Sequence, residues 1–332
     1  MKRMHKLWLL LLLPFIATAS LWSLQQVPPA ETQDAKPGGY KVSVKVNMIN
    51  VPVTVRKPEG GFIKGLKRDA FRIYEDGVPQ EITLFTQERL PTRIAIVLDI
   101  SGSVQTAWGS IRHATKRFLE YLEPEDRFSL YTFNTQTRLK MDWGISRERL
   151  DAVLGSIYCK DNTKLWDTIW AVSSNAFRGL EQKKAIIIMS DGLDNRSIVS
   201  YEEALDAAIR SEAAVYIVSK TEAVRQLYLY EKSVNNLYAN IPPETFMSAD
   251  LMLRKLARDT GGRVLYPNSF GQLDDIYEEV DEELRNQYTI GYISNNPMND
   301  GSYRQIEVRV NVPEASVSAR PGYYAPDETS SF

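Results

Sequence analysis

Cysteine and histidine are both scarce in this chain of 332 residues. The only cysteine, Cys159, excludes an intramolecular disulfide and lies too far along the chain for lipid attachment near the amino terminus. The two histidines are His5, in an apolar amino-terminal segment, and His113, inside a predicted helix. Serine hydrolysis typically needs a histidine base beside the nucleophile. The sequence therefore gives little support to a hydrolase with that mechanism.

A strong excess of charge of either sign is also missing. The 40 basic and 42 acidic residues give a formal net charge of −2. Proteins that bind nucleic acid commonly carry basic patches, so we expect no nucleic-acid partner. Hydrophobic residues make up 43% and charged residues 25% of the chain, as is usual for globular proteins. The length allows one large domain and a smaller one.

The amino terminus predicts export. It begins with several basic residues, continues with the apolar stretch 7–16, and then has Ala17-Thr18-Ala19 in the pattern of a signal-peptidase site. Apolar residues continue to Leu24 and nearly reach the length of a bilayer span. Residues 1–24 are therefore predicted to be a signal peptide or an uncleaved signal-anchor. The folded part would then be periplasmic or secreted, or exported and anchored to the inner membrane.

The two flanks of the mature chain have the alternating pattern of half-buried strands. In the segment 40–90, predicted strands 71–74 and 82–85 flank a connection with Asp76-Gly77, a typical hairpin turn. The segment 288–326 has further predicted strands at 288–292, 305–312 and 317–324. We predict that these two segments pack together as one small all-β unit.

Between the flanks, strand and helix patterns alternate from residue 91 to residue 287. Such alternation predicts an α/β domain with a doubly wound, mostly parallel sheet. Strand 128–133 is expected to pair with 138–143 as an antiparallel edge hairpin, and a helix is expected to begin near Val104. The Tyr-rich segment 220–249 is predicted to be a surface excursion. A partner-facing loop is the alternative, because tyrosines suit contact surfaces.

Polar residues follow two of the predicted buried strands and precede one helix. They are Asp99, Ser101 and Ser103 after the apolar run 94–98, Thr163 before the helix, and Asp191 after the apolar run 185–189. The carboxyl ends of parallel strands meet at one edge of a sheet, where ligands bind. Carboxylates and hydroxyls together suit Mg²⁺, Mn²⁺ or Ca²⁺. Taken singly, Ser103 and Thr163 also fit helix caps, and Asp191 followed by glycine also fits a turn.

The order Asp-Ile-Ser-Gly-Ser, then Thr before a Leu-aromatic-Asp helix start, then Ser-Asp-Gly after an aliphatic strand resembles the von Willebrand factor type A domain. That family has a Rossmann-like fold and a metal-ion-dependent adhesion site. The resemblance implies a divalent cation, Mg²⁺ before Mn²⁺ or Ca²⁺, and a protein partner whose Asp or Glu carboxylate completes the coordination. It implies these metal ligands: Asp99, Ser101, Ser103, Thr163 and Asp191.

The flanks carry a second resemblance. Residues 66–77, 288–292 and 320–324 are similar to an exported bacterial group in which a type A domain sits between β segments. The predicted organisation is a signal peptide or signal-anchor over 1–24, a flexible linker over 25–39, a β segment over 40–90, the type A domain over 91–287, a β segment over 288–326 and a tail over 327–332.

Together these features predict an exported, metal-dependent binding or adhesion module without enzymatic activity. One alternative is a structural or assembly component of an envelope complex, in which the metal only stabilises the fold. The other is a metal-dependent hydrolase with Asp99 as nucleophile. The haloacid-dehalogenase-like pattern of such enzymes has a second aspartate where this chain has Ser101.

Overall fold

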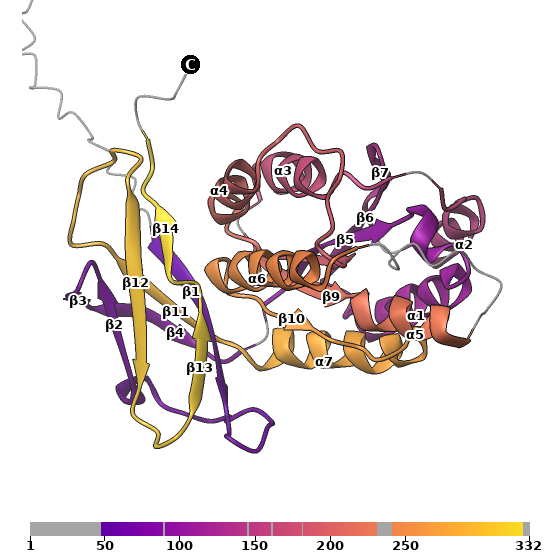
Figure 1. Ribbon diagram of the computed structural model, residues 1–332. Coiled ribbons are helices and arrows are strands. Elements are labelled where there is room, and N and C mark those ends of the chain that lie inside the picture. Colours follow the sequence, from indigo (N-terminus) through magenta and orange to yellow (C-terminus); the bar gives the residue numbers. More distant parts are fainter. Residues whose placement is uncertain are drawn as a thin grey trace, which may run out of the picture. The chain divides into compact units, whose positions relative to one another are not determined.

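A computed structural model describes residues 48–327, except 89, 145, 161, 181 and 231–240, and except the side chains of 147 and 227–230. The predicted signal segment and linker, the first part of the segment 40–90 and nearly all of the tail lie outside the described residues. Within the described part the strands form three sheets (Figure 1). No helix of the described part is long and apolar enough to cross a membrane.

The central sheet has six strands in the order β10-β9-β8-β5-β6-β7. Neighbouring strands are parallel except β6 and β7, which form an antiparallel edge hairpin. The prediction of a doubly wound, mostly parallel sheet is therefore confirmed. The strands are β5 (Thr92–Asp99), β6 (Arg127–Phe133), β7 (Thr137–Gly144), β8 (Lys183–Ser190), β9 (Ala214–Ser219) and β10 (Val264–Leu265).

Helices cover both faces of this sheet. Successive strand residues point to opposite faces, and in the central strands the residues on both faces are apolar and need to be covered. On β5, Ile94, Ile96 and Leu98 pack in one core cluster, while Ala95 and Val97 pack in another. The first cluster includes α1 (Trp108–Tyr121), α2 (Arg147–Gly155), α5 (Thr221–Tyr230) and α7 (Leu273–Asn286). The second includes α3 (Leu165–Asn175), α4 (Tyr201–Ser211) and α6 (Pro243–Asp259), as Figure 1 shows.

Two stretches of this domain differ from the prediction. A short 3-10 turn, Gly102–Val104, comes first, and α1 begins only at Trp108. The segment 220–249, expected as a surface excursion, begins as helix α5, with Ala223 and Val224 buried in the core. Its central residues, 231–240, lie outside the described part, so the partner-facing alternative stays a prediction.

The remaining strands form two antiparallel sheets, in the orders β13-β1-β11-β4 and β14-β12-β2-β3. Each sheet combines strands from both flanks, and side chains such as Val51, Phe71 and Tyr288 share one core between them. The all-β unit predicted from the flanks is therefore present. Its strands are β1 (Met48–Arg56), β2 (Phe71–Glu75), β3 (Val78–Gln80), β4 (Ile82–Thr86), β11 (Tyr288–Ile293), β12 (Tyr303–Val310), β13 (Ser316–Ala319) and β14 (Gly322–Tyr324).

Two details of this unit were predicted wrongly. The turn at Asp76-Gly77, where both residues have positive φ, joins β2 to the short β3, whereas β4 pairs with β11 in the other sheet. The single strand expected at 317–324 is two strands in different sheets. Pro321 stands between them, and proline lacks the N–H that a continuous strand would need.

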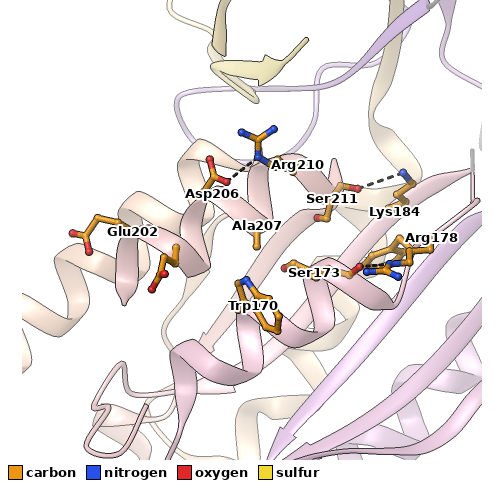
Figure 2. A pocket seen from close by; sticks show the side chains of 12 residues that line it. Trp170, Ser173, Arg178, Lys184, Glu202, Asp206, Ala207, Arg210 and Ser211 are labelled. Atoms are coloured by element: carbon orange, nitrogen blue, oxygen red, sulfur yellow. Dashed lines mark hydrogen bonds and ion pairs between the residues drawn. The ribbon is translucent and has the colours of Figure 1, made fainter. Parts of the chain in front are cut away.

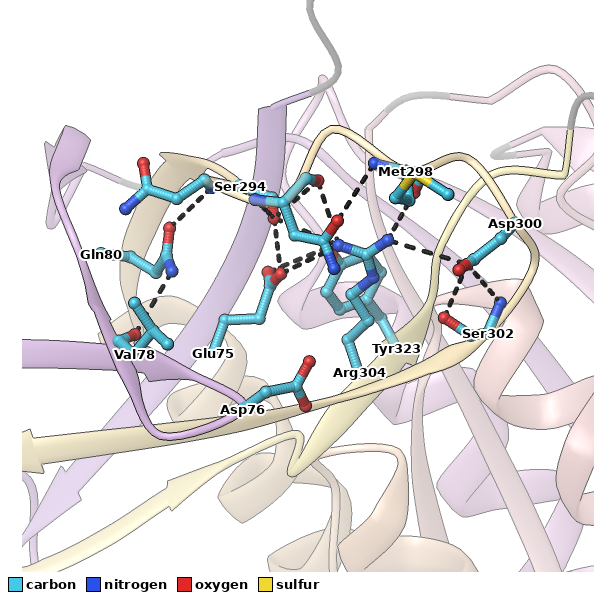
Figure 3. A network of polar contacts seen from close by, with 12 residues as sticks. Glu75, Asp76, Val78, Gln80, Ser294, Met298, Asp300, Ser302, Arg304 and Tyr323 are labelled. Carbon is cyan, nitrogen blue, oxygen red and sulfur yellow. Dashed lines mark hydrogen bonds and ion pairs between the residues drawn. The ribbon is translucent and has the colours of Figure 1, made fainter.

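A buried polar network links the two sheets of the β unit (Figure 3). The Glu75 carboxylate on β2 accepts hydrogen bonds from Tyr292 of β11 at 2.8 Å and from Tyr323 of β14 at 3.0 Å. It also lies 3.3 Å from Arg304 and 2.5 Å from the Ser294 hydroxyl. Burial alone would raise the pKa of Glu75, but these hydrogen bonds outweigh it and hold the pKa below its ordinary value.

Candidate cation site

Three neighbouring strands of the central sheet end in charged residues. Asp99 is the last residue of β5, Asp191 follows β8, and Lys220 follows β9. Because these strands are parallel neighbours in the order β9-β8-β5, their carboxyl ends lie at one edge of the sheet. The apolar strands fix this arrangement, since their side chains fill the cores on both faces.

The ammonium of Lys220 lies among four of the five predicted site residues. Its Nζ is 2.6 Å from Asp99 Oδ2 and 2.8 Å from Ser103 Oγ. It is also 3.4 Å from Ser101 Oγ and 3.4 Å from Asp191 Oδ2. The two serine hydroxyls are 3.0 Å apart and hydrogen-bonded to each other. The structure thus brings Asp99, Ser101, Ser103 and Asp191 together around a lysine.

In both carboxylates, one oxygen accepts a backbone hydrogen bond and the other faces Lys220. Oδ1 of Asp99 accepts the backbone N–H of Ser101 at 2.7 Å, and Oδ1 of Asp191 accepts that of Leu193 at 3.1 Å. In both residues the other oxygen, Oδ2, faces Lys220. Each carboxylate therefore holds its own loop with one oxygen and contributes the other to the site.

Thr163 is placed differently. It is buried on the loop before α3, and its backbone N–H donates to Asn195 Oδ1 on the loop after β8. The four residues around the ammonium do not include it. Neither Thr163 nor Ser103 serves as a cap, because Lys164 precedes α3 and Ala107 precedes α1, and neither helix has a side-chain cap. The capping interpretation of these two residues is therefore wrong.

The site is almost closed to solvent. The side chain of Lys220 is 1% exposed, and those of Asp99 and Asp191 are 0% and 4% exposed. Burial lowers the pKa of Lys220. The carboxylates of Asp191 and Asp99 and their hydrogen bonds raise it by more than burial lowers it, so the pKa lies above its ordinary value. The amine is therefore protonated, and two carboxylates with one ammonium leave the cluster a single net negative charge.

Cys159 lies beside this cluster. Its side chain is buried, and burial together with the charge of Asp99 raises the pKa of the thiol to about 12. The thiol is therefore protonated at neutral pH and is a poor nucleophile.

The donors suit a divalent ion in kind, but the arrangement leaves it no room. Mg²⁺ and Ca²⁺ bind oxygens at roughly 2.0–2.6 Å, and the point that faces Asp99, Ser101, Ser103 and Asp191 holds the Lys220 ammonium. A second cation there would meet strong like-charge repulsion. In the described part of the chain no group of three or more His, Cys, Asp or Glu side chains could hold a metal ion.

Sequence reasoning missed Lys220. A lysine after a strand is usually a solvated surface residue, and no local motif marks this one. The available signal was its position, because Lys220 follows a buried apolar strand in the same way as Asp99 and Asp191 do.

A surface groove lies elsewhere, between α3 and α4 (Figure 2). Several of its charged side chains already have partners: Arg210 pairs with Asp206 at 2.8 Å, and Lys184 donates to the Ser211 carbonyl at 3.3 Å. It is lined by none of the predicted site residues. We therefore assign it no ligand.

Comparison with known proteins identifies the α/β domain. The family model of the von Willebrand factor type A domain matches residues 94–279. No curated protein matches the sequence significantly.

Several solved structures are similar to this chain at low identity. A von Willebrand factor type A protein from Catenulispora acidiphila is 12% identical, with a TM-score of 0.48 over 86% of this chain and 76% of its own. Proximal thread matrix protein 1 from the mussel byssus, with a zinc-occupied MIDAS motif, is 14% identical, with a TM-score of 0.46 over 63% of this chain and 49% of its own. BatB from Bacteroides thetaiotaomicron is 18% identical, with a TM-score of 0.42 over 58% of this chain and 98% of its own.

Proposed function

Because the chain belongs to the von Willebrand factor type A domain family, we propose that it is an exported, non-catalytic module that binds a protein partner. The partner would dock on the loops at the carboxyl edge of the central sheet. Export is supported by the amino-terminal signal pattern. The main evidence for this docking surface is that two large apolar side chains on these loops are exposed.

These side chains are Tyr158, 82% exposed, and Ile198, 88% exposed. Their loops are held in place: the N–H of Lys160 donates to the Ile100 carbonyl at 2.8 Å, and that of Ile198 donates to Asp167 Oδ1 at 2.7 Å. Apolar side chains on a fixed backbone lose little entropy when a partner covers them. They therefore favour an interaction surface.

The geometry of the polar cluster disfavours catalysis. A serine beside a lysine can act as a nucleophile and base, and Ser103 lies 2.8 Å from Lys220 Nζ. The base must be neutral to accept the proton, however, and the carboxylates around Lys220 keep it charged. Asp99 is also a poor nucleophile here, because each of its oxygens is already hydrogen-bonded.

The chemistry of the partner follows from the charge of the site. The cluster is buried and has a net negative charge, so it would repel a further carboxylate. The proposal therefore places the contact on the surrounding loops. The partner carboxylate and the Mg²⁺ ion that the family motif implies are therefore not part of this proposal. A purely structural role is the second candidate, because a fully buried ion cluster is compatible with a part that only stabilises the fold.

Partner capture tests the proposal. The purified chain would be used as bait in envelope and culture extracts of the source organism, beside the variant Tyr158→Ser/Ile198→Ser. We expect capture by the variant to fall at least about tenfold, because it loses two apolar contacts that the partner would bury in the complex. Met298→Ser, at an exposed apolar residue of the β unit, is the matched control and should capture normally. Equal capture by all three proteins would overturn the proposed surface, and capture of nothing would favour the structural role.

A further inference from the structure

We propose that the Lys220 ammonium is the resident cation of this site and takes the place of the divalent ion that the family motif implies. The inference concerns what fills the site, and it does not depend on the identity of a partner. It rests on the contacts of Nζ, on the way the lysine backbone is held, and on the charge of the surrounding side chains.

The contacts of Nζ are those of a well-placed ammonium. An ammonium has three N–H donors. The short distances of 2.6 Å to Asp99 and 2.8 Å to Ser103 account for two of them. Ser101 and Asp191, both at 3.4 Å, lie within reach of the third. The oxygens that would coordinate a metal are thus arranged around a hydrogen-bond donor.

The backbone of Lys220 is fixed on both sides. Its N–H donates to the Ser190 carbonyl at 3.1 Å, which ties it to the end of β8. Its carbonyl accepts the N–H of Val224 at 2.8 Å, in the first turn of α5. The side chain therefore enters the site from a defined position between a strand and a helix.

The charges make the ammonium hard to replace. Asp99 and Asp191 are buried carboxylates, and a buried charge without a compensating partner is strongly destabilising. Lys220 pairs with both of them within the chain, so the folded domain carries its cation from the start. A divalent ion could enter only by displacing a tethered group of the same sign. We therefore expect folding and function of the wild-type chain to be independent of divalent metal.

Metal titration of the full mature chain tests this directly. Isothermal calorimetry with Mn²⁺ and with Mg²⁺ should show no saturable binding to the wild type. Lys220→Met removes the ammonium and keeps most of the side-chain volume. This variant should bind one Mn²⁺ at least about 100-fold more tightly than the wild type does, because the repulsion at close range is gone. Its thermal midpoint should rise when Mn²⁺ is added, and that of the wild type should not move.

Two controls separate this effect from general changes. Lys184→Met removes a lysine that pairs with Glu212 near the start of β8, and it should gain no metal binding. Lys220→Met/Asp99→Asn removes the ammonium together with one carboxylate, so it should fold without metal and bind Mn²⁺ weakly. Lys220→Met alone could fold only when Mn²⁺ is present, and this result would itself support the proposal. In that case the double variant, which should fold without metal, still allows a metal titration.

Three results would overturn the inference. One is saturable Mn²⁺ binding by the wild type with the affinity of Lys220→Met. Another is a well-folded Lys220→Met variant that binds no metal. The third is an intact mass of the wild type lower by one water than its sequence requires, with the loss mapped to Lys220 and Asp99. Such an amide would be neutral and could not serve as a cation.

Discussion

The Glu283 carboxylate on α7 lies 2.6 Å from the Arg56 guanidinium on β1. The last helix of the type A domain is thus paired with the β unit. Glu283 is 1% exposed, and it also accepts hydrogen bonds from Thr54 at 3.2 Å and from Arg263 at 2.6 Å. One buried carboxylate therefore joins a helix, a strand of the β unit and the loop before β10. This contact makes the β unit a packed neighbour of the domain that it flanks in sequence.

Glu283→Gln tests that link. The amide keeps the shape of the side chain but loses the charge that two arginines share. We expect the free energy of unfolding in urea to fall by about 1–3 kcal/mol, the usual range for losing charge-assisted hydrogen bonds at a buried site. Glu282→Gln, at the exposed neighbouring residue of the same helix, should change stability by less than about 0.5 kcal/mol. Equal effects in the two variants would show that the contact contributes nothing.

Removal of the carboxyl-terminal strands tests the β unit as a whole. Strand β1 lies between β11 and β13, and β2 pairs with β12. A chain that lacks residues 288–326 would leave both amino-terminal strands without these neighbours and with their backbone groups exposed. We expect new protease cleavage between residues 40 and 88, mapped by mass spectrometry. Unchanged resistance there would mean that the amino-terminal segment folds by itself.

Local patterns predicted most of this fold because the hydrophobic pattern of the side chains identifies the strands. The runs 94–98 and 185–189 are apolar throughout, as strands buried on both faces are, and they form the centre of the sheet. Partners across the β unit were harder to predict. Ile82 to Thr86 has the same alternation whether it pairs with β2 or with β11, and only the shared core decides between the two sheets.

The network around Glu75 predicts a loss of stability in acid. The folded-state pKa of Glu75 lies below its ordinary value of 4.5. Its contribution to stability is therefore complete above that value and is lost as the pH falls through the lower folded-state pKa. Glu75→Gln should cost about 1–3 kcal/mol at neutral pH, and the gap to the wild type should narrow in urea titrations as the pH falls below 4.5, the ordinary pKa of this carboxyl group.

The control for this prediction is Glu81→Gln, at an exposed carboxylate of the same β unit. Its difference from the wild type should stay within about 0.5 kcal/mol at every pH tested. A gap between Glu75→Gln and the wild type that stays constant down to acid pH would contradict the prediction. The network would then stabilise through shape and hydrogen bonds that do not depend on the charge.

Gly192 is required beside the cation site for two reasons. Its φ of +77° lies in the left-handed region, and a Cβ there would come within 3.0 Å of Ala249 and Leu253 on α6. Gly179 has a similar φ of +72° with no atom within 4 Å of its Cβ position. Gly179→Ala should therefore cost only backbone strain, about 1 kcal/mol. Gly192→Ala should cost about 1–3 kcal/mol more because of crowding, measured by urea unfolding. Equal losses would show that α6 moves aside freely.

The site itself was only partly predictable. Asp99 ends its strand, Ser101, Ser103 and Asp191 follow strand ends, and the sheet topology alone brings them to one edge. Lys220 escaped prediction because a single lysine has no spacing pattern, and its role depends on the order of strands β9, β8 and β5. Thr163 shows the opposite problem. Its motif position is clear, but the structure places its backbone against Asn195 and leaves it out of the contacts around the ammonium.

The place of Thr163 in the donor set can be tested in the background that accepts metal. If Thr163 contributes a hydroxyl to a cation at the centre of the site, Lys220→Met/Thr163→Ala should bind Mn²⁺ about 10–100-fold more weakly than Lys220→Met. The matched control is Thr168→Ala in the same background, because the hydroxyl of Thr168, on α3, donates to the carbonyl of Lys164, just before the helix, and should not affect the affinity for Mn²⁺. Circular dichroism would show whether each variant is folded. Equal Mn²⁺ affinity with and without the Thr163 hydroxyl would reduce the donor set to the four residues that surround Lys220. In that case the threonine only supports the loop before α3.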